Sequence, residues 1–519
     1  MRTLVARIER ALERGGSVTF VNGDASERVE WARLYDEATT VAAALQARGV
    51  GPGSHVALLG PTTRSLVTTI EAVWLAGGTL VVLPLPMRLG SLDEFVAQTR
   101  ARVRNADASL LVVDPDLAAF VEPQPGDPPM VLLSDLVGGA HGWSYERPKD
   151  DPSALAVLQF TSGSTADPKG VMLPHATICA NLDAASSAAA LVPGEDVLVS
   201  WLPLYHDMGL IGLLTLPMLT GADLVLAAPQ DFMASPARWM EWMSAFGGTA
   251  TAGPNFSYAL AARALGRLSG LDLSRWRVAL NGAEPVDPAT VSAFVAAGAP
   301  HGLSAGAVFP AFGMAELAIA GSFPPPGRGL ALDVVDRRLL EEERLAVPAS
   351  GDGASAATRS LALLGRPVPG LEFRICDPGS GASMRAREVG ELEIRGTSVT
   401  PGYYRHPEAT EAAFHDGWLR TGDLAYLVDG ELVICGRIKD VIIVGGRNVF
   451  PEDVERAVAA VDGVRPGNVI AFGVTGRKGR EALVVVAEAR DGSAVTPVRD
   501  EVARRVLSAV GLPCEEVVL

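Results

Sequence analysis

The first half of the chain alternates apolar runs of strand length with helical segments, and this alternation limits the possible folds more than any other feature. A helical pattern over 31–48 leads into the apolar run 56–60, and a second over 63–76 leads into 79–84. Fully apolar strands separated by helices are typical of parallel sheets covered on both faces. Further apolar runs follow at 109–113, 154–160 and 223–227. We therefore predict an α/β body of doubly wound sheets over residues 1–323.

The pattern changes near residue 324, where PPPGRG is followed by a charged segment rich in Ala, Ser and Gly over 333–360. Short alternating strands come next, separated by Gly and Asp turns. These strands predict a β-barrel-like subdomain of the large domain over 324–437. Two helical and two strand patterns follow, which predict a small, mobile C-terminal α+β domain over 438–519.

The charge balance argues against a nucleic-acid partner. The chain has 44 Lys and Arg against 60 Asp and Glu, a formal net charge of −16, which repels phosphate backbones and anionic lipid. The most apolar stretch, 210–228, is interrupted by Pro217, Gly221 and Asp223, so we expect no membrane span. The N-terminus lacks the apolar run of a signal peptide. Four cysteines without CxxC spacing fit a reducing compartment, so we expect a cytoplasmic protein.

The segment LQFTSGSTADPKGVMLPH, residues 158–175, is the densest chemical signal. A strand opens into hydroxyl and glycine residues and then reaches Lys169. Hydroxyls, backbone N–H groups and a lysine are what a loop needs to hold a polyphosphate. It is not a Walker A loop, because Gly170 and Val171 follow Lys169 in place of the Ser or Thr that would bind Mg²⁺. We predict a phosphate-binding loop; an ordinary Ser/Thr/Gly turn is the alternative.

Six further motifs follow in order. They are WLPLYHDMGLIG (201–212), LNGAEPV (280–286), PAFGMAE (310–316), GYYRHPEAT (402–410), GWLRTGDLAYL (417–427) and GRIKDVIIVGGRNVFPEDVE (436–455). Together with the phosphate loop they closely resemble the adenylate-forming superfamily of acyl-CoA synthetases, peptide-synthetase adenylation domains and luciferases. Within it, the chain looks most like the fatty acyl-AMP ligases, and the resemblance covers nearly the whole chain.

The resemblance implies an acid–thiol ligase of lipid or natural-product biosynthesis that uses ATP and Mg²⁺. A carboxylic acid would attack the α-phosphate to give acyl-AMP, and a pantetheine thiol would then take the acyl group. The sequence identifies neither the acid nor the acceptor, coenzyme A or an acyl carrier protein. The segment 333–360 lies where fatty acyl-AMP ligases carry an insertion, which favours the carrier protein.

The resemblance also implies a nucleotide site with catalytic roles for Lys169, His206, Glu316 and Arg437. Glu316 would ligate Mg²⁺, and Phe312 would stack on adenine where the family usually has Tyr. Asp423 would accept hydrogen bonds from the ribose hydroxyls, and the alternative is an aspartate that only stabilises a turn. For Arg437 the alternative is a charged residue on the surface. The full set implied for ATP or AMP is Thr161, Ser162, Gly163, Ser164, Thr165, Gly282, Ala283, Glu284, Phe312, Gly313, Met314, Ala315, Asp423 and Arg437.

The remaining implied roles concern the acyl group, the thiol and a hinge. Lys439 would be the hinge about which the small domain rotates, and Gly445 and Gly446 would let the pantetheine arm pass, with a hairpin turn as the alternative. An aromatic and methionine cluster over 232–246 lies at helical spacing, and plain core is its alternative. The predicted acyl pocket comprises His206, Asp207, Phe232, Met233, Gly282 and Met314.

One family residue cannot be matched. The family's C-terminal domain delivers a lysine to the carboxylate and α-phosphate during adenylation, and Lys478 lies too early in the chain for that role. Either a tail is missing from the sequence or the enzyme lacks this lysine. In the second case the protein would mainly convert acyl-AMP to thioester.

Two other classes of function remain open from the sequence. GLSAG at 302–306 fits the G-x-S-x-G pattern of serine hydrolases, but a helix precedes it and an apolar strand-like run follows, the reverse of a nucleophile elbow. An inactive acyl-adenylate binding protein is the other alternative. The unmatched lysine supports it, whereas Lys169, Glu316, Asp423 and Arg437 argue against it.

Overall fold

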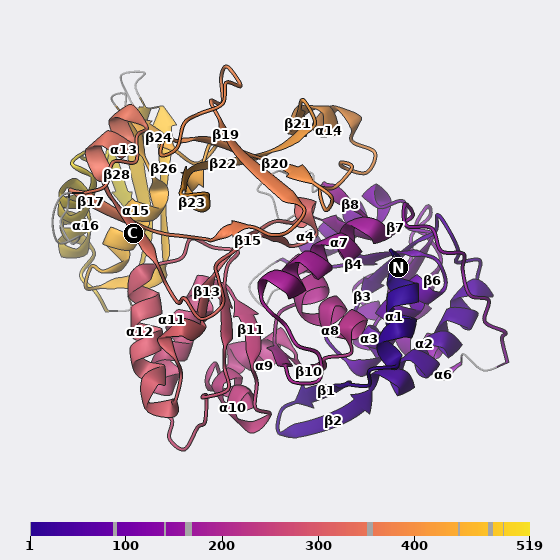
Figure 1. Cartoon of the computed structure of the whole chain (residues 1–519). Helices are drawn as coiled ribbons and strands as arrows, with labels where there is room; N and C mark the ends of the chain where they lie inside the picture. Colours follow the sequence, from indigo (N-terminus) through magenta and orange to yellow (C-terminus); the bar gives the residue numbers. More distant parts are fainter. Residues whose placement is uncertain are drawn as a thin grey trace.

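Two mainly parallel sheets form the N-terminal body of the computed structural model (Figure 1). The structure describes residues 2–86, 91–139, 142–160, 169–349, 357–444, 447–475, 481–490 and 492–519. In the six-stranded sheet only β7 and β8 pair antiparallel. Its order is β6 (Met130–Leu132), β5 (Leu110–Val113), β3 (His55–Leu59), β4 (Thr79–Val82), β7 (Leu155–Phe160) and β8 (Gly170–Pro174).

The seven-stranded sheet carries most of the candidate site. Only the hairpin of β1 and β2 is antiparallel. Its order is β13 (Val308–Pro310), β12 (Val278–Asn281), β11 (Ala250–Gly253), β9 (Val197–Ser200), β10 (Asp223–Ala227), β1 (Ser17–Asn22) and β2 (Ala25–Glu30). The doubly wound α/β class predicted from the apolar runs is confirmed.

Helices connect the parallel strands, as a parallel sheet requires. The predicted helix 63–76 is α3, Arg64–Leu75, and Thr63 caps it by accepting a hydrogen bond from the Leu66 amide. The other long helices of the body are α1 (Leu4–Leu12), α2 (Trp31–Gln46), α4 (Leu92–Asn105), α7 (His175–Ala188), α10 (Ala237–Ala245), α11 (Asn255–Leu265) and α12 (Pro288–Gly298).

The apolar stretch 210–228 is divided among three short elements. They are the π-helix η1 (Met208–Thr215), the helix α8 (Leu216–Thr220) and β10. Within the part of the chain that the structure describes, no helix is both long enough and apolar enough to cross a bilayer.

The β-rich segment forms a five-stranded antiparallel sheet with smaller two- and three-stranded sheets beside it. Hydrogen bonds from the Leu364 amide to Leu432 and from the Leu432 amide to Gly365 join β23 to the chain before β18. The strands are β14 (Phe312–Gly313), β15 (Ala320–Phe323), β16 (Leu332–Asp336), β17 (Thr358–Ala362), β18 (Arg366–Pro367), β19 (Leu371–Cys376), β20 (Gly390–Gly396), β21 (Phe414–His415), β22 (Trp418–Val428) and β23 (Glu431–Arg437), with helices α13 (Arg337–Glu343) and α14 (Pro407–Ala413).

The C-terminal part has its own apolar cluster, drawn from residues 442–517. In Figure 1 this part, in yellow, packs beside α13. Its elements are β24 (Ile442–Val444), β25 (Arg447–Val449), α15 (Pro451–Ala459), β26 (Val464–Thr475), β27 (Glu481–Ala489), α16 (Val495–Val510) and β28 (Glu516–Val518). The domain boundaries at 323 and 437 and the mobility of this part stay predictions.

The N-terminal helix α1 is held to the body through a buried histidine. The Leu4 amide donates to Nδ1 of His175 at 3.2 Å, so that nitrogen must carry no proton. The Thr3 hydroxyl donates to Asp150 at 2.6 Å beside it. Burial lowers the pKa of His175 to about 4, although Asp151 and Asp150 partly oppose the shift.

This contact predicts an acid-sensitive attachment of α1. Between pH 6.5 and 4, His175 is protonated in the unfolded chain but not in the folded one. The free energy of unfolding therefore falls as the pH falls, by about 2 kcal/mol between pH 7 and 5. His175→Asn keeps an acceptor near the Nδ1 position but cannot be protonated. We expect its urea midpoint to fall less than the wild-type midpoint between pH 7 and 5. Equal falls in the two proteins would contradict the assignment.

Candidate active site

A cavity of about 1290 Å³ opens where the two sheets, the β-rich segment and the turn after β23 meet. Its walls include the end of β7, the helix α7, the π-helix η1 and the ends of β11 and β12. Single-ligand pockets usually measure about 300–1,000 Å³. The cavity therefore has room for more than one bound group, such as a nucleotide and a second substrate.

Most of the predicted site residues that the structure describes line this cavity. The described ones that do not line it are Lys169, Phe232, Met233, Glu284 and Asp423. The buried carboxylate of Asp423 accepts a hydrogen bond from Arg437, which does line it. Thr161, Ser162, Gly163, Ser164, Thr165, Gly445 and Gly446 fall outside the described residues. The predicted residues that line the cavity are His206, Asp207, Gly282, Ala283, Phe312, Gly313, Met314, Ala315, Glu316, Arg437 and Lys439.

Glu316 is a buried carboxylate beside the cavity, held by a tyrosine that the sequence analysis did not single out. The Tyr403 hydroxyl donates to Oε1 of Glu316 at 2.8 Å, and Nζ of Lys169 lies 5.2 Å from the centre of the Tyr403 ring. Burial raises the pKa of Glu316, while the Tyr403 hydrogen bond opposes the shift. Tyr403 lies in the GYYRHPEAT motif, whose aromatic pair was the only available signal for it.

Arg437 joins the predicted ribose residue to the cavity. Its Nε donates to Oδ1 of Asp423 at 3.0 Å, and its side chain is about half exposed. Burial raises the pKa of Asp423, and the charge and hydrogen bond of Arg437 oppose that rise. Asp423 is thus a buried carboxylate with one cationic partner that reaches the cavity.

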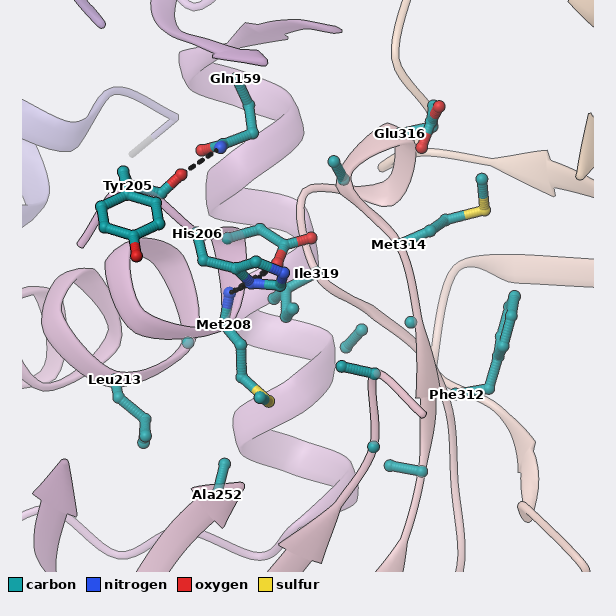
Figure 2. Close-up of a pocket in the computed structure, with 18 of the residues that line it drawn as sticks. Gln159, Tyr205, His206, Met208, Leu213, Ala252, Phe312, Met314, Glu316 and Ile319 are labelled. Carbon is teal, nitrogen blue, oxygen red and sulfur yellow. Dashed lines mark hydrogen bonds and ion pairs between the residues drawn. The ribbon is translucent and has the colours of Figure 1, made fainter. Parts of the chain in front are cut away.

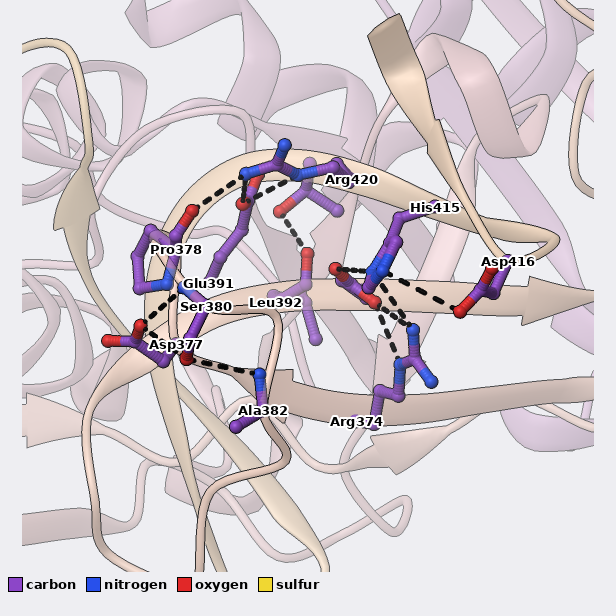
Figure 3. A network of polar contacts seen from close by, with 12 residues as sticks. Arg374, Asp377, Pro378, Ser380, Ala382, Glu391, Leu392, His415, Asp416 and Arg420 are labelled. Atoms are coloured by element: carbon purple, nitrogen blue, oxygen red, sulfur yellow. Dashed lines mark hydrogen bonds and ion pairs between the residues drawn. The ribbon is translucent and has the colours of Figure 1, made fainter. Parts of the chain in front are cut away.

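A polar network surrounds the part of β22 that carries Asp423 (Figure 3). The buried carboxylate of Glu391, on β20, accepts a hydrogen bond from the Gly422 amide at 3.1 Å and one from Nε of Arg420 at 2.9 Å. The Thr421 hydroxyl donates to the Leu392 carbonyl at 2.9 Å. These bonds tie Arg420, Thr421 and Gly422 to the neighbouring strand β20.

His206 and Asp207 form the polar edge of the cavity nearest to η1 (Figure 2). Nδ1 of His206 lies 2.6 Å from Oδ1 of Asp207, which also accepts the Met208 amide at 2.7 Å. Burial alone would lower the pKa of His206, but the hydrogen bond and charge of Asp207 outweigh it and raise that pKa. Asp207 thus counteracts the effect of burial on this imidazole.

Two glycines allow close packing around Phe312, the residue predicted to stack on adenine. The Phe312 ring lies over Gly321, where a Cβ would come within 2.7 Å of the ring. A Cβ at Gly313 would lie 1.9 Å from the Ile319 carbonyl oxygen, so β14 and β15 need glycine there. Ala283 has a φ of 67°, and such left-handed alanines are typical of functional loops.

Phe232 and Met233, predicted for the acyl pocket, do not line the cavity. Phe232 is fully buried and stacks on Trp201 with ring centres 3.7 Å apart, whereas Met233 is 63% exposed. Trp239, Met240, Trp242 and Met243 of the cluster are buried on α10, and Trp239 donates a hydrogen bond to Thr251 of the seven-stranded sheet.

The apolar part of the cavity comes from residues that the sequence analysis did not assign. They come from α7 and the segment after it, from η1 and α8, from β9, β11 and β12, and from β15 and the residue before it. The apolar run after the YHD motif was the signal that could have found those on η1. Among these apolar lining residues are Leu182, Ala185, Ala189, Leu191, Leu198, Met208, Gly212, Leu213, Leu216, Ala250, Ala252, Val278, Leu280, Ile319, Ala320 and Phe323.

The GLSAG segment has no hydrolase geometry. The Ser304 hydroxyl accepts the Gly306 amide at 3.2 Å, and the segment runs from α12 into β13 rather than from a strand into a helix. A nucleophile elbow needs the opposite order.

The chain matches a known enzyme family and resembles proteins of known structure. Residues 8–404 match the family described as AMP-binding enzyme. A protein of Mycobacterium tuberculosis described as a ligase, Rv1013, is 39% identical over 500 residues, covering 95% of this chain and 90% of that protein. A structure from a study of fatty acyl-adenylate ligases from E. coli and L. pneumophila superposes with a TM-score of 0.92 at 30% identity, covering 100% of this chain and 93% of that one.

A second solved structure adds bound ligands to the comparison. It is a fatty acyl-adenylate ligase from L. pneumophila in complex with acyl adenylate and pyrophosphate. It superposes with a TM-score of 0.79 at 28% identity, covering 99% of this chain and 92% of that one.

The Tyr403 hydrogen bond predicts how the site responds to pH. Tyr403→Phe removes a donor that favours the ionised form of Glu316, so the pKa of Glu316 rises further. We expect the pH below which MgATP binding weakens to rise by about 1 unit, from a hydrogen bond worth about 1 kcal/mol. Calorimetric titration between pH 5 and 8 measures it. Tyr404→Phe is the matched control, and an equal shift in it would count against the role of Tyr403.

Proposed function

Because the chain belongs to the AMP-binding enzyme family, we propose that it is an acyl ligase that activates an apolar carboxylic acid as acyl-AMP. One observation carries this proposal: a single cavity is lined by predicted nucleotide residues, His206 and Glu316 among the site residues, and by apolar side chains of β9, β11, β12 and η1, here called its apolar branch. Activation of an acid by ATP needs this arrangement, because the carboxylate must meet the α-phosphate.

The first half of the reaction joins the acid to the nucleotide. A carboxylate oxygen attacks the α-phosphorus of ATP, a new P–O bond forms, and the bond to pyrophosphate breaks. His206, whose pKa Asp207 raises, would contact the carboxylate, and Arg437, paired with Asp423, would hold the ribose side of the nucleotide. These groups act by position and charge and form no covalent bond with the substrates.

In the second half a thiol takes the acyl group. The sulfur attacks the acyl carbon, the bond from that carbon to the phosphate oxygen breaks, and AMP leaves with the electron pair. We propose a pantetheine thiol as the acceptor, on coenzyme A or on a carrier protein. The segment 333–360 lies where fatty acyl-AMP ligases carry an insertion, and this position favours the carrier protein.

The residues present fit a magnesium ion delivered with ATP. Among the described residues there is no group of three or more His, Cys, Asp or Glu side chains that could hold a metal by itself. Mg²⁺ usually needs only one or two carboxylates together with substrate phosphates, and the buried Glu316 provides one. When bound there, Mg²⁺ would neutralise phosphate charge. Its positive charge would also compensate the burial that raises the pKa of Glu316.

The assay for the proposed function is detection of acyl-AMP by mass spectrometry with MgATP and a panel of saturated acids. We expect acyl-AMP from the wild type and about 10²–10³ less from Glu316→Gln, which keeps the shape of the side chain but removes its charge. Glu408→Gln on the exposed face of α14 is the matched control and should behave as wild type. No acyl-AMP from the wild type with any acid would overturn the proposal.

Rotation of the C-terminal part about Lys439 is a separate proposal. The turn after β23 is closed by hydrogen bonds from the amides of Asp440 and Val441 to the Arg437 carbonyl, and Lys439 lies at its centre. Proline at 439 would fix one backbone angle and restrict Ile438 as well.

Lys439→Pro should therefore leave one half-reaction active and abolish the other. Adenylation is measured from acid and MgATP, and thioester formation is measured from synthetic acyl-AMP and coenzyme A. Lys439→Ala removes the side chain without the backbone restriction, and we expect it to retain both halves. Equal loss of both halves in Lys439→Pro would show that the hinge lies elsewhere.

A further inference from the structure

The apolar branch of the cavity runs along one face of the seven-stranded sheet. Ala252 on β11 and Leu280 on β12 are register partners, and both line the cavity. Two residues earlier, Ala250 pairs with Leu198 on β9 and with Val278 on β12, and all three also line it. Side chains two residues apart in a strand point to the same face, so these residues form two successive rows, an upper row and a lower row.

The two rows lie at different depths. The candidate nucleotide residues Gly282 and Ala283 follow the carboxyl end of β12, so the upper row is nearer to the chemistry and the lower row is farther from it. Parallel strands rise about 3.3 Å per residue, which separates the rows by about 6.6 Å. An extended alkyl chain covers this distance with about five methylene groups.

Small side chains keep this branch open. Ala252 and Ala250 provide the floor on β11, and Figure 2 shows Ala252 pointing from its strand toward Met208. Ala185 and Gly212 face the same branch from α7 and η1. The opposite face of the same strands is filled instead by Trp239, which donates a hydrogen bond to Thr251 at 3.1 Å. Of the two faces of these strands, the one with the small side chains is thus the one that continues into the candidate active site.

We propose that Ala250 and Ala252 set the length of the acyl chain that the enzyme accepts, with Ala250 in the lower row determining the longest chain. The proposal rests on the proposed function, because it assumes that the acid lies in this cavity with its carboxyl group toward His206. The substrate it implies is an unbranched aliphatic acid whose chain lies along the sheet face and reaches the lower row.

Leucine at either position tests the proposal, since its added carbons would enter the cavity rather than a packed core. Ala250→Leu should lower the chain length of maximal kcat/KM for acyl-AMP formation. Ala252→Leu blocks the upper row. Its optimal acid should therefore be about five carbons shorter than that of Ala250→Leu, because of the spacing between the rows. The assay uses saturated acids of even and odd chain length at saturating MgATP.

Two further variants distinguish blocking of the cavity from a general loss of stability or activity. Val278 lies directly across from Ala250, so Ala250→Leu combined with Val278→Ala restores space in the lower row and should return the optimum toward the wild-type length. Val199→Ile adds bulk to β9 beside Thr251, whose side chain faces away from the cavity toward α10, and should leave the optimum unchanged.

The outcomes are distinguishable. An unchanged optimum in Ala250→Leu, an equal optimum in the two leucine variants, or no recovery in the double variant would overturn the length-setting role. All three results leave the proposed function intact as long as the wild type makes acyl-AMP. Absence of acyl-AMP in the wild type contradicts the proposed function itself.

Discussion

Burial of acidic side chains around one cavity is the constraint on which the arrangement of the site depends. A buried carboxylate needs a donor or a cation, because its charge loses the solvation of water. Glu316 has the Tyr403 hydroxyl, Asp423 has Arg437, and Asp207 has His206. Asp423 and Arg437 face each other on the neighbouring strands β22 and β23, so this pair joins two strands of the β-rich segment. Hydrogen bonds from the Met172 amide to Gly402 and from the Tyr404 amide to Gly170 join that segment to β8 of the body.

The two faces of the seven-stranded sheet have different surroundings. One face packs against Trp239 and Tyr258, whose rings meet edge to face with centres 5.2 Å apart. The other face carries the alanines and borders the cavity. Because side chains alternate between faces along a strand, a sequence of four residues such as Ala250–Gly253 contributes to both.

The C-terminal part is held to the β-rich segment by a buried ion pair. Nε of Arg359, on β17, lies 2.9 Å from Oδ2 of Asp453, on α15, and both side chains are almost fully buried. Arg359 also stacks over the Phe450 ring at 4.1 Å and donates to the Cys435 carbonyl at 2.9 Å. Separating a buried pair leaves an uncompensated charge on each side. Any rotation of the C-terminal part must therefore expose both groups to water or give them new partners.

The sequence by itself determined the α/β class and the order of the motifs, because apolar runs and turn residues act over short distances along the chain. It also indicated Glu316, His206 and Arg437, which the structure brings to one cavity. Tertiary structure alone decided that Phe232 belongs to the core, since periodicity shows that a face is buried but not what buries it. It also decided the partnership of Tyr403 with Glu316, 87 residues apart, and the rows of β9, β11 and β12, because strand register depends on contacts between distant segments.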